Sequence, residues 1–323
     1  MMNWFTDGRA AVLLIGCLLG AASAARSLFR HGGEGRKAYK TVGLFLLLAA
    51  PLCLAGARAL FCLLDFMNMY RIAENPMLIL DPGYGGLTLY GGMLGFFAAG
   101  AIAARLRGRG FLSLMDALAP AGLVMIACVR VIEGMSGHGF SFDVENPAYC
   151  FFPLSVFDPD WEVWYLALFM LEAAYALGAA AVLRLRGSSA PGERACTALL
   201  LYAGMQVWFE SLRRDNFMRA VNGFVRTMQV ISMLIVTAIL IAALLRSSRR
   251  PAWKTGAVLA HALMIGGVVF FEFAVEYKIG FLEHFSKRVL TQSGHYFFCY
   301  GCMLLCVLGM MVNAFRVRRS GVK

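Results

Sequence analysis

Apolar runs of about 20 residues, the length of helix that crosses the hydrocarbon core of a bilayer, alternate with short polar segments along the whole chain. This pattern predicts an all-α fold, a polytopic bundle of transmembrane helices. The nine predicted spans are residues 10–28, 41–64, 86–104, 112–132, 162–183, 195–212, 227–245, 256–276 and 293–315.

Lys and Arg residues gather in alternate polar segments. With the N-terminus placed outside, 19 of the 30 Lys and Arg residues fall in the five inner segments, 26–40, 105–109, 184–194, 246–254 and 316–323. Cytoplasmic loops are enriched in these residues, so we predict that the N-terminus lies outside and the C-terminus inside (N-out, C-in). The net charge of +11 follows from this topology, and we expect no nucleic-acid partner.

The composition changes this picture little. Hydrophobic residues make up 60% of the chain and charged residues 15%, with a mean hydropathy of +0.67. The first apolar run follows an acid-containing segment and lacks a small-residue cleavage site, so we expect no cleavable signal peptide. The nine cysteines lie mostly in predicted spans, where a thiol packs as a small apolar group. We predict no disulfide framework, no metal, not even at Cys299 and Cys302, and no cofactor.

Polar residues inside four predicted spans fall at one predicted depth, near the outer interface. Ionisable side chains within a membrane are costly and usually face the interior of a bundle or a cavity. We therefore predict an anion site at the level of the outer headgroups, where an arginine can hold a phosphate with two hydrogen bonds. The residues at this depth are Arg58, Tyr90, Gly91, Gly92, Arg130, Glu133, Glu210 and Arg213.

The longest predicted connection, from Glu133 to Trp161, contains no Lys or Arg and several acids. A connection of that length is usually functional or mobile. It includes His138 in a Ser-Gly-His-Gly sequence, a candidate because histidine titrates near neutral pH.

Four stretches, taken in order, resemble the bacterial prolipoprotein diacylglyceryl transferase family over residues 5–250. Gly85-Gly-Leu-Thr-Leu-Tyr90-Gly-Gly-Met-Leu-Gly95 is similar to the glycine-rich third helix of the family, and Arg130 falls at its signature arginine. Gln206-Val-Trp-Phe-Glu210-Ser-Leu-Arg213 resembles its Arg-Phe-x-x-Glu-x-x-Arg helix. Gln229-Val-Ile-Ser232 resembles the start of its last span.

The resemblance implies an enzyme with a seven-span core that transfers a diacylglyceryl group from phosphatidylglycerol to the thiol of a lipobox cysteine in a prolipoprotein. The implied partners are phosphatidylglycerol, the prolipoprotein and membrane lipids, in the bacterial cytoplasmic membrane. The residues expected to be catalytic are Tyr90, Arg130, Glu133 and Glu210. Those expected to bind substrate are Gly91, Gly92, Arg58, Gln206, Arg213 and His138.

The chain departs from the family pattern at several of these positions. Tyr90 stands where many members have histidine, and Gln206 replaces a second arginine. Glu133 replaces Asn or Cys, and of a Gln-Leu-Tyr-Glu sequence only Tyr165 remains. An alternative is therefore a non-catalytic relative that binds anionic lipid or a lipoprotein precursor.

The same residues also have purely structural interpretations. Arg130 can be an arginine that extends to the interface, and Glu133, three residues on, can simply neutralise it across one helical turn. The same holds for Glu210 with Arg213, and interfacial tyrosines such as Tyr90 are common in membrane proteins.

We predict two domains: a transferase-like membrane core at 1–250 and a two-span C-terminal extension at 251–323. The extension carries Glu272 and Glu276 one helical turn apart. A small transporter that uses these acids is a third interpretation, and the lack of internal repeats argues against it.

Overall fold

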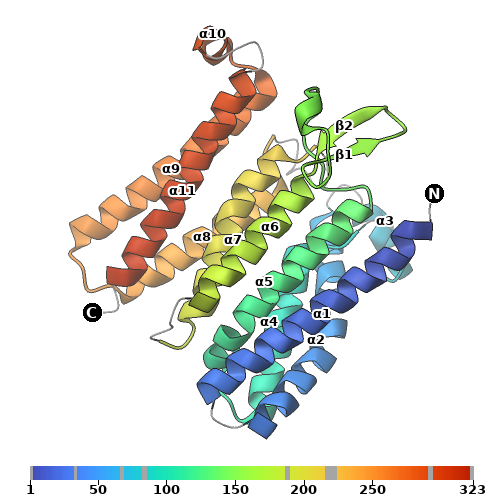
Figure 1. The fold of residues 1–323 in the computed structure, drawn as a ribbon. Helices are drawn as coiled ribbons and strands as arrows, with labels where there is room; N and C mark the ends of the chain where they lie inside the picture. Colours follow the sequence, from blue (N-terminus) through green and yellow to red (C-terminus); the bar gives the residue numbers. More distant parts are fainter. Residues whose placement is uncertain are drawn as a thin grey trace. The chain divides into compact units, whose positions relative to one another are not determined.

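The computed structural model describes residues 3–32, 35–65, 69–81, 86–185, 190–214, 224–289 and 294–320 (Figure 1). Most of the described residues are helical, and they include one short β-hairpin. The elements in order are α1 (Asn3–Gly32), α2 (Gly35–Leu64), α3 (Met69–Glu74), the 3-10 helix η1 (Pro76–Ile79), α4 (Leu89–Arg107), α5 (Phe111–Met135), the 3-10 helix η2 (Pro147–Tyr149), β1 (Ser155–Asp158), β2 (Val163–Leu166), α6 (Leu168–Leu185), α7 (Glu193–Leu212), α8 (Thr227–Arg246), α9 (Pro251–Tyr277), α10 (Gly280–Val289) and α11 (Gly294–Ser320).

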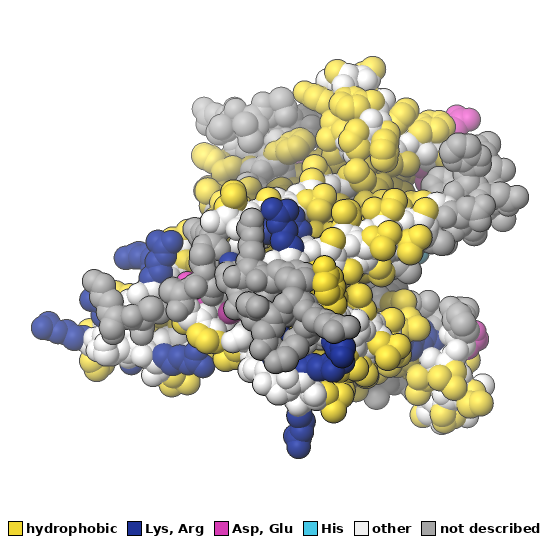
Figure 2. Space-filling model, turned by 60° about the horizontal axis from the view of Figure 1, so that its bottom comes forward, with side chains coloured by type: hydrophobic (Ala, Val, Ile, Leu, Met, Phe, Trp, Pro, Cys, Tyr) yellow, Lys and Arg dark blue, Asp and Glu magenta, His cyan; other side chains and the backbone are white. Residues whose placement is uncertain are grey.

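Seven helices in the described part of the chain are long and apolar enough to cross a membrane: α2, α4, α5, α6, α8, α9 and α11. Their surfaces present large apolar side chains such as Leu47, Leu94 and Leu263, as expected for helices in contact with lipid. Figure 2 shows apolar side chains over much of one face, with Lys and Arg side chains standing among them. The chain is a multi-pass membrane protein, as predicted.

The other two predicted spans, α1 and α7, are also helices. Their crossing of the membrane and the N-out, C-in orientation stay predictions. The start of the predicted span at 162–183 is wrong, because residues Val163–Leu166 form strand β2, which pairs antiparallel with β1. Valine and aromatic residues suit a strand as well as an apolar helix, so the apolar pattern alone did not separate the two.

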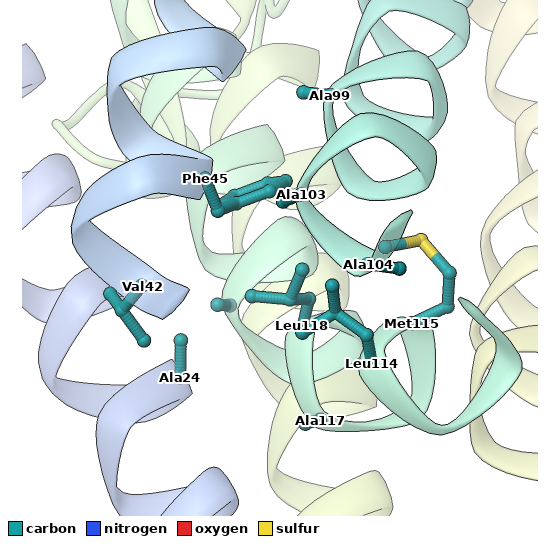
Figure 3. Packing of buried hydrophobic residues seen from close by; sticks show 11 residues of the cluster. Ala24, Val42, Phe45, Ala99, Ala103, Ala104, Leu114, Met115, Ala117 and Leu118 are labelled. Atoms are coloured by element: carbon teal, nitrogen blue, oxygen red, sulfur yellow. The ribbon is translucent and has the colours of Figure 1, made fainter. Parts of the chain in front are cut away.

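The chain divides into two compact units, and each is described by itself. Unit 1 comprises Met1–Gly139 and Phe169–Ala198, and unit 2 comprises Phe140–Leu168 and Leu199–Lys323. In unit 1, helices α1, α2, α4 and α5 pack side by side. Their shared core consists largely of small residues of α4 against larger side chains of α2 and α5, such as Ala103 beside Phe45 and Leu118 (Figure 3). Small residues let the helix backbones approach closely. Close packing of this kind can hold helices together in lipid, where the hydrophobic effect does not drive their association.

Helices α2 and α4 make the closest of these approaches at glycines. A Cβ atom on Gly91 would lie 2.3 Å from the carbonyl oxygen of Gly56, and one on Gly95 would lie 2.1 Å from that of Leu52. Thr88 caps the N-terminus of α4, accepting from the Gly91 N–H at 3.3 Å and donating to the Ala57 carbonyl at 3.2 Å. The first turn of α4 is therefore fixed against α2.

In unit 2, the C-terminal helices pack on the helices that precede them. Helix α11 lies beside α9 and contacts α8. The indole N–H of Trp208 in α7 donates to the carbonyl of Tyr300 in α11 at 2.9 Å. A Cβ on Gly204 would lie 2.5 Å from Cγ of Met311, so α11 also packs tightly against α7.

Candidate functional site

Arg130 lies one turn before the end of α5 and is bound by two carboxylates within unit 1. Its Nη1 atom lies 2.5 Å from Oε2 of Glu133, and its Nε atom lies 2.9 Å from Oε2 of Glu172 in α6. The side chains of Arg130 and Glu172 are 7% and 0% exposed, whereas Glu133 is 23% exposed. We call these three residues the Arg130 cluster.

Two tight contacts bring the start of α6 against the end of α5. The Phe169 ring packs so closely on Gly134 that a Cβ there would lie 2.4 Å from the ring. The Phe169 N–H donates to the carbonyl of Gly139 at 3.0 Å, and Gly139 has a positive φ of 76° that favours glycine. Glu172 is three residues after Phe169, so this packing places its carboxylate beside Arg130.

The Arg130 cluster carries one positive and two negative formal charges. A buried cation requires such compensation, and a guanidinium has five N–H donors that can serve several oxygens at once. Glu133 is the more exposed of the two carboxylates, whereas the Glu172 side chain is fully buried. The cluster therefore combines a fixed cation with a partly accessible proton acceptor.

Tyr90 is buried in the first turn of α4, also in unit 1. Gly91 faces the backbone of α2, whereas a Cβ added to Gly92 would make only ordinary contacts there, 3.8 Å from the carbonyl oxygen of Cys53. The structure thus gives Gly91 a packing reason, the close approach of two helices. The predicted roles of Tyr90 in catalysis and of both glycines in substrate binding stay predictions.

Arg58 of α2 holds the segment that precedes α4. Its guanidinium donates to four backbone carbonyls, those of Ile79 at 2.7 Å, Leu78 at 2.7 Å, Asp81 at 2.9 Å and Gly86 at 3.1 Å. These hydrogen bonds support a role for Arg58 in fixing the backbone of the segment that leads into α4. Its predicted contact with a headgroup stays a prediction.

Unit 2 contains a second buried polar cluster at the end of α7. The Gln206 amide donates to Oε1 of Glu210 at 2.7 Å, and Nε of Arg213 lies 3.7 Å from the same oxygen. All three side chains are buried. The glutamine that replaces the family's arginine is thus hydrogen-bonded to the acid one turn away.

This cluster continues into α8. The Arg226 guanidinium donates to the carbonyl of Arg213, and the backbone N–H of Arg226 donates to the Gln229 amide oxygen at 3.4 Å. Arg226 is buried and lies at the N-cap of α8. Because the N-terminus of a helix is electropositive, this position adds to the positive character of the arginine.

Arg214, the neighbour of Arg213, anchors the segment that contains the β1–β2 hairpin. Its guanidinium lies 2.7 Å from Oδ1 of Asp143 and 4.5 Å from the ring centre of Tyr165. The backbone N–H of Arg214 donates to the carbonyl of Phe140 at 2.9 Å. The Ser141 hydroxyl donates to the Leu212 carbonyl at 2.5 Å. These contacts explain why a basic pair follows α7 against the charge bias of the predicted outer side.

His138 lies in the turn after α5, and its side chain is exposed. Its backbone N–H donates to the Glu133 carbonyl at 3.2 Å, which ties the turn to the helix. Its role in substrate binding stays a prediction. In the described part of the chain, no group of three His, Cys, Asp or Glu side chains is placed to hold a metal ion.

Sequence reasoning missed Glu172 and Arg226. Glu172 carried a usable signal, because it is an acid inside the predicted span 162–183, and such acids usually have a function or a partner. Arg226 lies just before the predicted span 227–245, where an arginine is common and carries little information.

The fold and the Arg130 cluster define a multi-pass helical membrane protein with a buried, ion-paired arginine. The family model of prolipoprotein diacylglyceryl transferases matches residues 8–246. The chain is similar to the phosphatidylglycerol–prolipoprotein diacylglyceryl transferase of Bacillus licheniformis, with 30% identity over 74% of this chain and 86% of that protein. It is also similar to the enzyme of the same name from Geobacillus kaustophilus, with 29% identity over 68% of this chain and 81% of that protein. The chain belongs to the prolipoprotein diacylglyceryl transferase family.

Proposed function

We propose that this protein transfers the diacylglyceryl group of phosphatidylglycerol to the thiol of a lipobox cysteine in a prolipoprotein, at the outer leaflet of the bacterial cytoplasmic membrane. The observation that carries this proposal is the Arg130 cluster in a chain of this family. The relatives from Bacillus licheniformis and Geobacillus kaustophilus are named for this lipid and this acceptor.

In the proposed reaction, the cysteine sulfur attacks the glyceryl carbon that is esterified to phosphate. A carbon–sulfur bond forms, the carbon–oxygen bond to phosphate breaks, and glycerol phosphate leaves. The thiol proton passes to a base and then to bulk water. Only the thiolate is an effective nucleophile, so a proton acceptor near the sulfur is required.

We assign binding of the leaving phosphate to Arg130 and acceptance of the thiol proton to Glu133. An arginine stays charged and stabilises the negative charge that builds on the leaving phosphate. Glu172 holds the guanidinium from its buried side, at Nε. Glu133 is the more exposed carboxylate of the cluster and lies next to the same cation.

For unit 2, we propose that Glu210 is catalytic and that Gln206 and Arg213 bind the polar part of the substrate, with Gln206 also holding Glu210 in place. The hydrogen bond between Gln206 and Glu210 supports this assignment. We also propose that residues 1–250 form the transferase core and 251–323 a C-terminal extension, since the family match ends at residue 246.

The second candidate is a non-catalytic relative that binds phosphatidylglycerol or a lipoprotein precursor. Tyr90 and Gln206 favour it, because each replaces a residue type that the family pattern prefers. A tyrosine hydroxyl with a pKa of about 10 is a much weaker base than histidine near neutral pH.

An in vitro transfer assay separates the two candidates. The purified protein would be mixed with phosphatidylglycerol vesicles and a lipobox peptide, and the peptide mass and released glycerol phosphate would be followed. We expect a diacylglyceryl mass gain that is lost in Arg130→Ala and kept in Arg105→Ala, an exposed arginine at the end of α4. Specific binding of the lipid with neither product would instead establish the non-catalytic relative.

A further inference from the structure

Helix α10 connects α9 and α11, two candidate spans of unit 2 that follow the residues matching the family model. The two spans run antiparallel. Near one end, Nε2 of His295 lies 3.1 Å from the carbonyl oxygen of Ala274, and near the other end the Asn313 amide donates to the carbonyl of Ala257 at 2.9 Å. The end of α9 and the start of α11 therefore reach the same membrane surface, and α10 lies at this shared end (Figure 1).

The length of α10 keeps it at that surface. It has 10 residues, which form a helix about 15 Å long, half the thickness of the hydrocarbon core. Both of its ends are tied to spans that emerge there. The question is therefore which face of α10 meets the protein and which faces meet the surroundings.

One face of α10 is fastened to both spans through Ser286 and His295, which are buried. The Ser286 hydroxyl lies 3.2 Å from Nδ1 of His295, and Nε2 of the same ring lies beside the carbonyl oxygen of Ala274. These contacts join α10 to α11 and α11 to α9. The face of α10 that carries Ser286 therefore points toward the spans, and this fixes the rotation of α10 about its own axis.

The aromatic side chains of α10 lie on a second face. Phe281 and Phe285 are one helical turn apart and are 79% and 46% exposed. The Phe285 ring also contacts that of Phe298 in α11, with 5.7 Å between the ring centres. Tyr277 at the end of α9 and Phe297 near the start of α11 are exposed as well. Exposed aromatic residues at the ends of spans are typical of the layer where a protein meets the lipid headgroups.

The charged side chains of α10 lie on a third face. Glu283 and Lys287 are one turn apart and form an ion pair at 2.6 Å. Lys278, two residues before α10, is exposed. Residues 278–289 carry three basic residues and one acid. A short helix with exposed phenylalanines on one face and an excess of basic residues suits a surface that is apolar beneath and anionic above.

We propose that α10 is an interfacial helix that binds the surface of an anionic phospholipid bilayer. Phe281 and Phe285 insert at the boundary between headgroups and acyl chains, and Lys278 and Lys287 extend to the lipid phosphates. The bilayer is the one that α9 and α11 cross, because both ends of α10 are held at its surface. This inference goes beyond the proposed function and does not rest on it. It gives the C-terminal extension a lipid-binding role.

Other occupants of the aromatic face make different predictions. If a second copy of the chain or a partner protein covers Phe281, a photoreactive group at this position joins to protein. If the face is open to water, such a group joins to nothing. If the bilayer covers it, the group joins to phospholipid.

The test uses the full chain in nanodiscs that contain phosphatidylglycerol and phosphatidylcholine with the same acyl chains in equal amounts. The variants are Phe281→p-benzoylphenylalanine and the same replacement at Phe285, Glu283 and Leu263. Leu263 is an exposed residue of α9 and is the positive control for lipid contact. Glu283, on the charged face, is the matched control within α10. Thermal unfolding shows whether each variant is folded, and mass spectrometry identifies the adducts after irradiation.

We expect phospholipid adducts at Phe281 and Phe285 in yields at least about fivefold above that at Glu283, because only the aromatic face lies among the lipids. Equal yields at Phe281 and Glu283, or no adduct at Phe281 while Leu263 gives one, would overturn the inference. Protein adducts at Phe281, in nanodiscs or in cell membranes irradiated before purification, would also overturn it. If the Phe281 variant does not fold, Phe285 provides the same comparison.

The identity of the captured lipid tests the lysines. The Phe281 variant should capture phosphatidylglycerol about threefold more often than phosphatidylcholine, because lysines near the surface attract anionic lipid. This preference should disappear when Lys278→Gln and Lys287→Gln are added, and should persist with Lys254→Gln at the other end of α9. Equal capture of the two lipids with both lysines present would overturn the assignment of an anionic surface. Since no readout uses transfer, a chain without transfer activity refutes the proposed function and leaves this result unaffected.

Discussion

The Nε atom of Arg130 lies 2.9 Å from Oε2 of Glu172, and both side chains are almost completely buried. The pair joins the end of α5 to the first turn of α6. Removing one partner of a buried ion pair leaves an uncompensated charge, which costs far more than the pair itself contributes.

Glu172→Ala should therefore lower the free energy of unfolding by about 3 kcal/mol and abolish transfer. Glu133→Ala should abolish or strongly reduce transfer with a smaller loss of stability, because Glu133 is partly exposed. Thermal unfolding in detergent and the transfer assay measure the two effects. Equal losses of stability in both variants would contradict the expectation that the more exposed carboxylate, Glu133, contributes less to stability than Glu172.

The glycines of α4 should tolerate no side chain where α2 passes. Gly95→Ala would place its Cβ 2.1 Å from the Leu52 carbonyl, so the two helices must move apart. Overpacking of this kind costs about 1–3 kcal/mol. Gly178→Ala in α6 is the matched control, since no described atom beyond its chain neighbours and its own helix backbone lies within 4 Å of the added Cβ. We expect it to be neutral or to stabilise the helix by about 0.5 kcal/mol. A wild-type melting temperature for Gly95→Ala would contradict this packing.

Asp116 of α5 caps the start of α7 within unit 1. Its Oδ2 atom accepts from the Gly192 N–H at 2.7 Å and its Oδ1 atom from the Ala195 N–H at 2.8 Å. Asp116→Ala should cost about 1–2 kcal/mol of stability, because it leaves two N–H groups of a helix terminus without their acceptors. Asp143→Ala removes an exposed carboxylate that pairs with Arg214 and should cost less than about 1 kcal/mol. Thermal unfolding of both variants checks that Asp116→Ala loses more stability than Asp143→Ala. A larger loss in Asp143→Ala would contradict the capping role of Asp116.

Glu283 provides a pH test outside the predicted spans. The hydrogen bond from Lys287, at 2.6 Å, and the lysine charge hold the pKa of this carboxyl below its ordinary value of 4.5. Because the pKa is lowered in the folded state, the pair contributes stability above pH 4.5 and loses it as the pH falls through the lowered pKa. A carboxyl NMR titration should give a midpoint below 4.5 that moves up in Lys287→Met. A midpoint unchanged by Lys287→Met would show that the pair does not form in solution.

The helical membrane fold and the position of Arg130 could both be read from the order of residues. The apolar runs are long enough to fix helices by local composition alone, and Arg130 stands out because an arginine within such a run is costly. The segment Val163–Leu166 shows where this reading fails. Its apolar residues pair with β1, and that pairing depends on a partner segment that helical hydropathy does not register.

The sequence by itself determined the class of protein, most of its helices and several of the residues in its two polar clusters. Tertiary structure decided which groups bind one another: Glu172 with Arg130, Arg58 with the carbonyls before α4, and Glu272 with Gln229. The physical reason is the distance along the chain over which each interaction acts. Helix formation and membrane insertion depend on residues within a few turns, whereas a buried charge is satisfied by whichever helix packs against it, often far away in the chain.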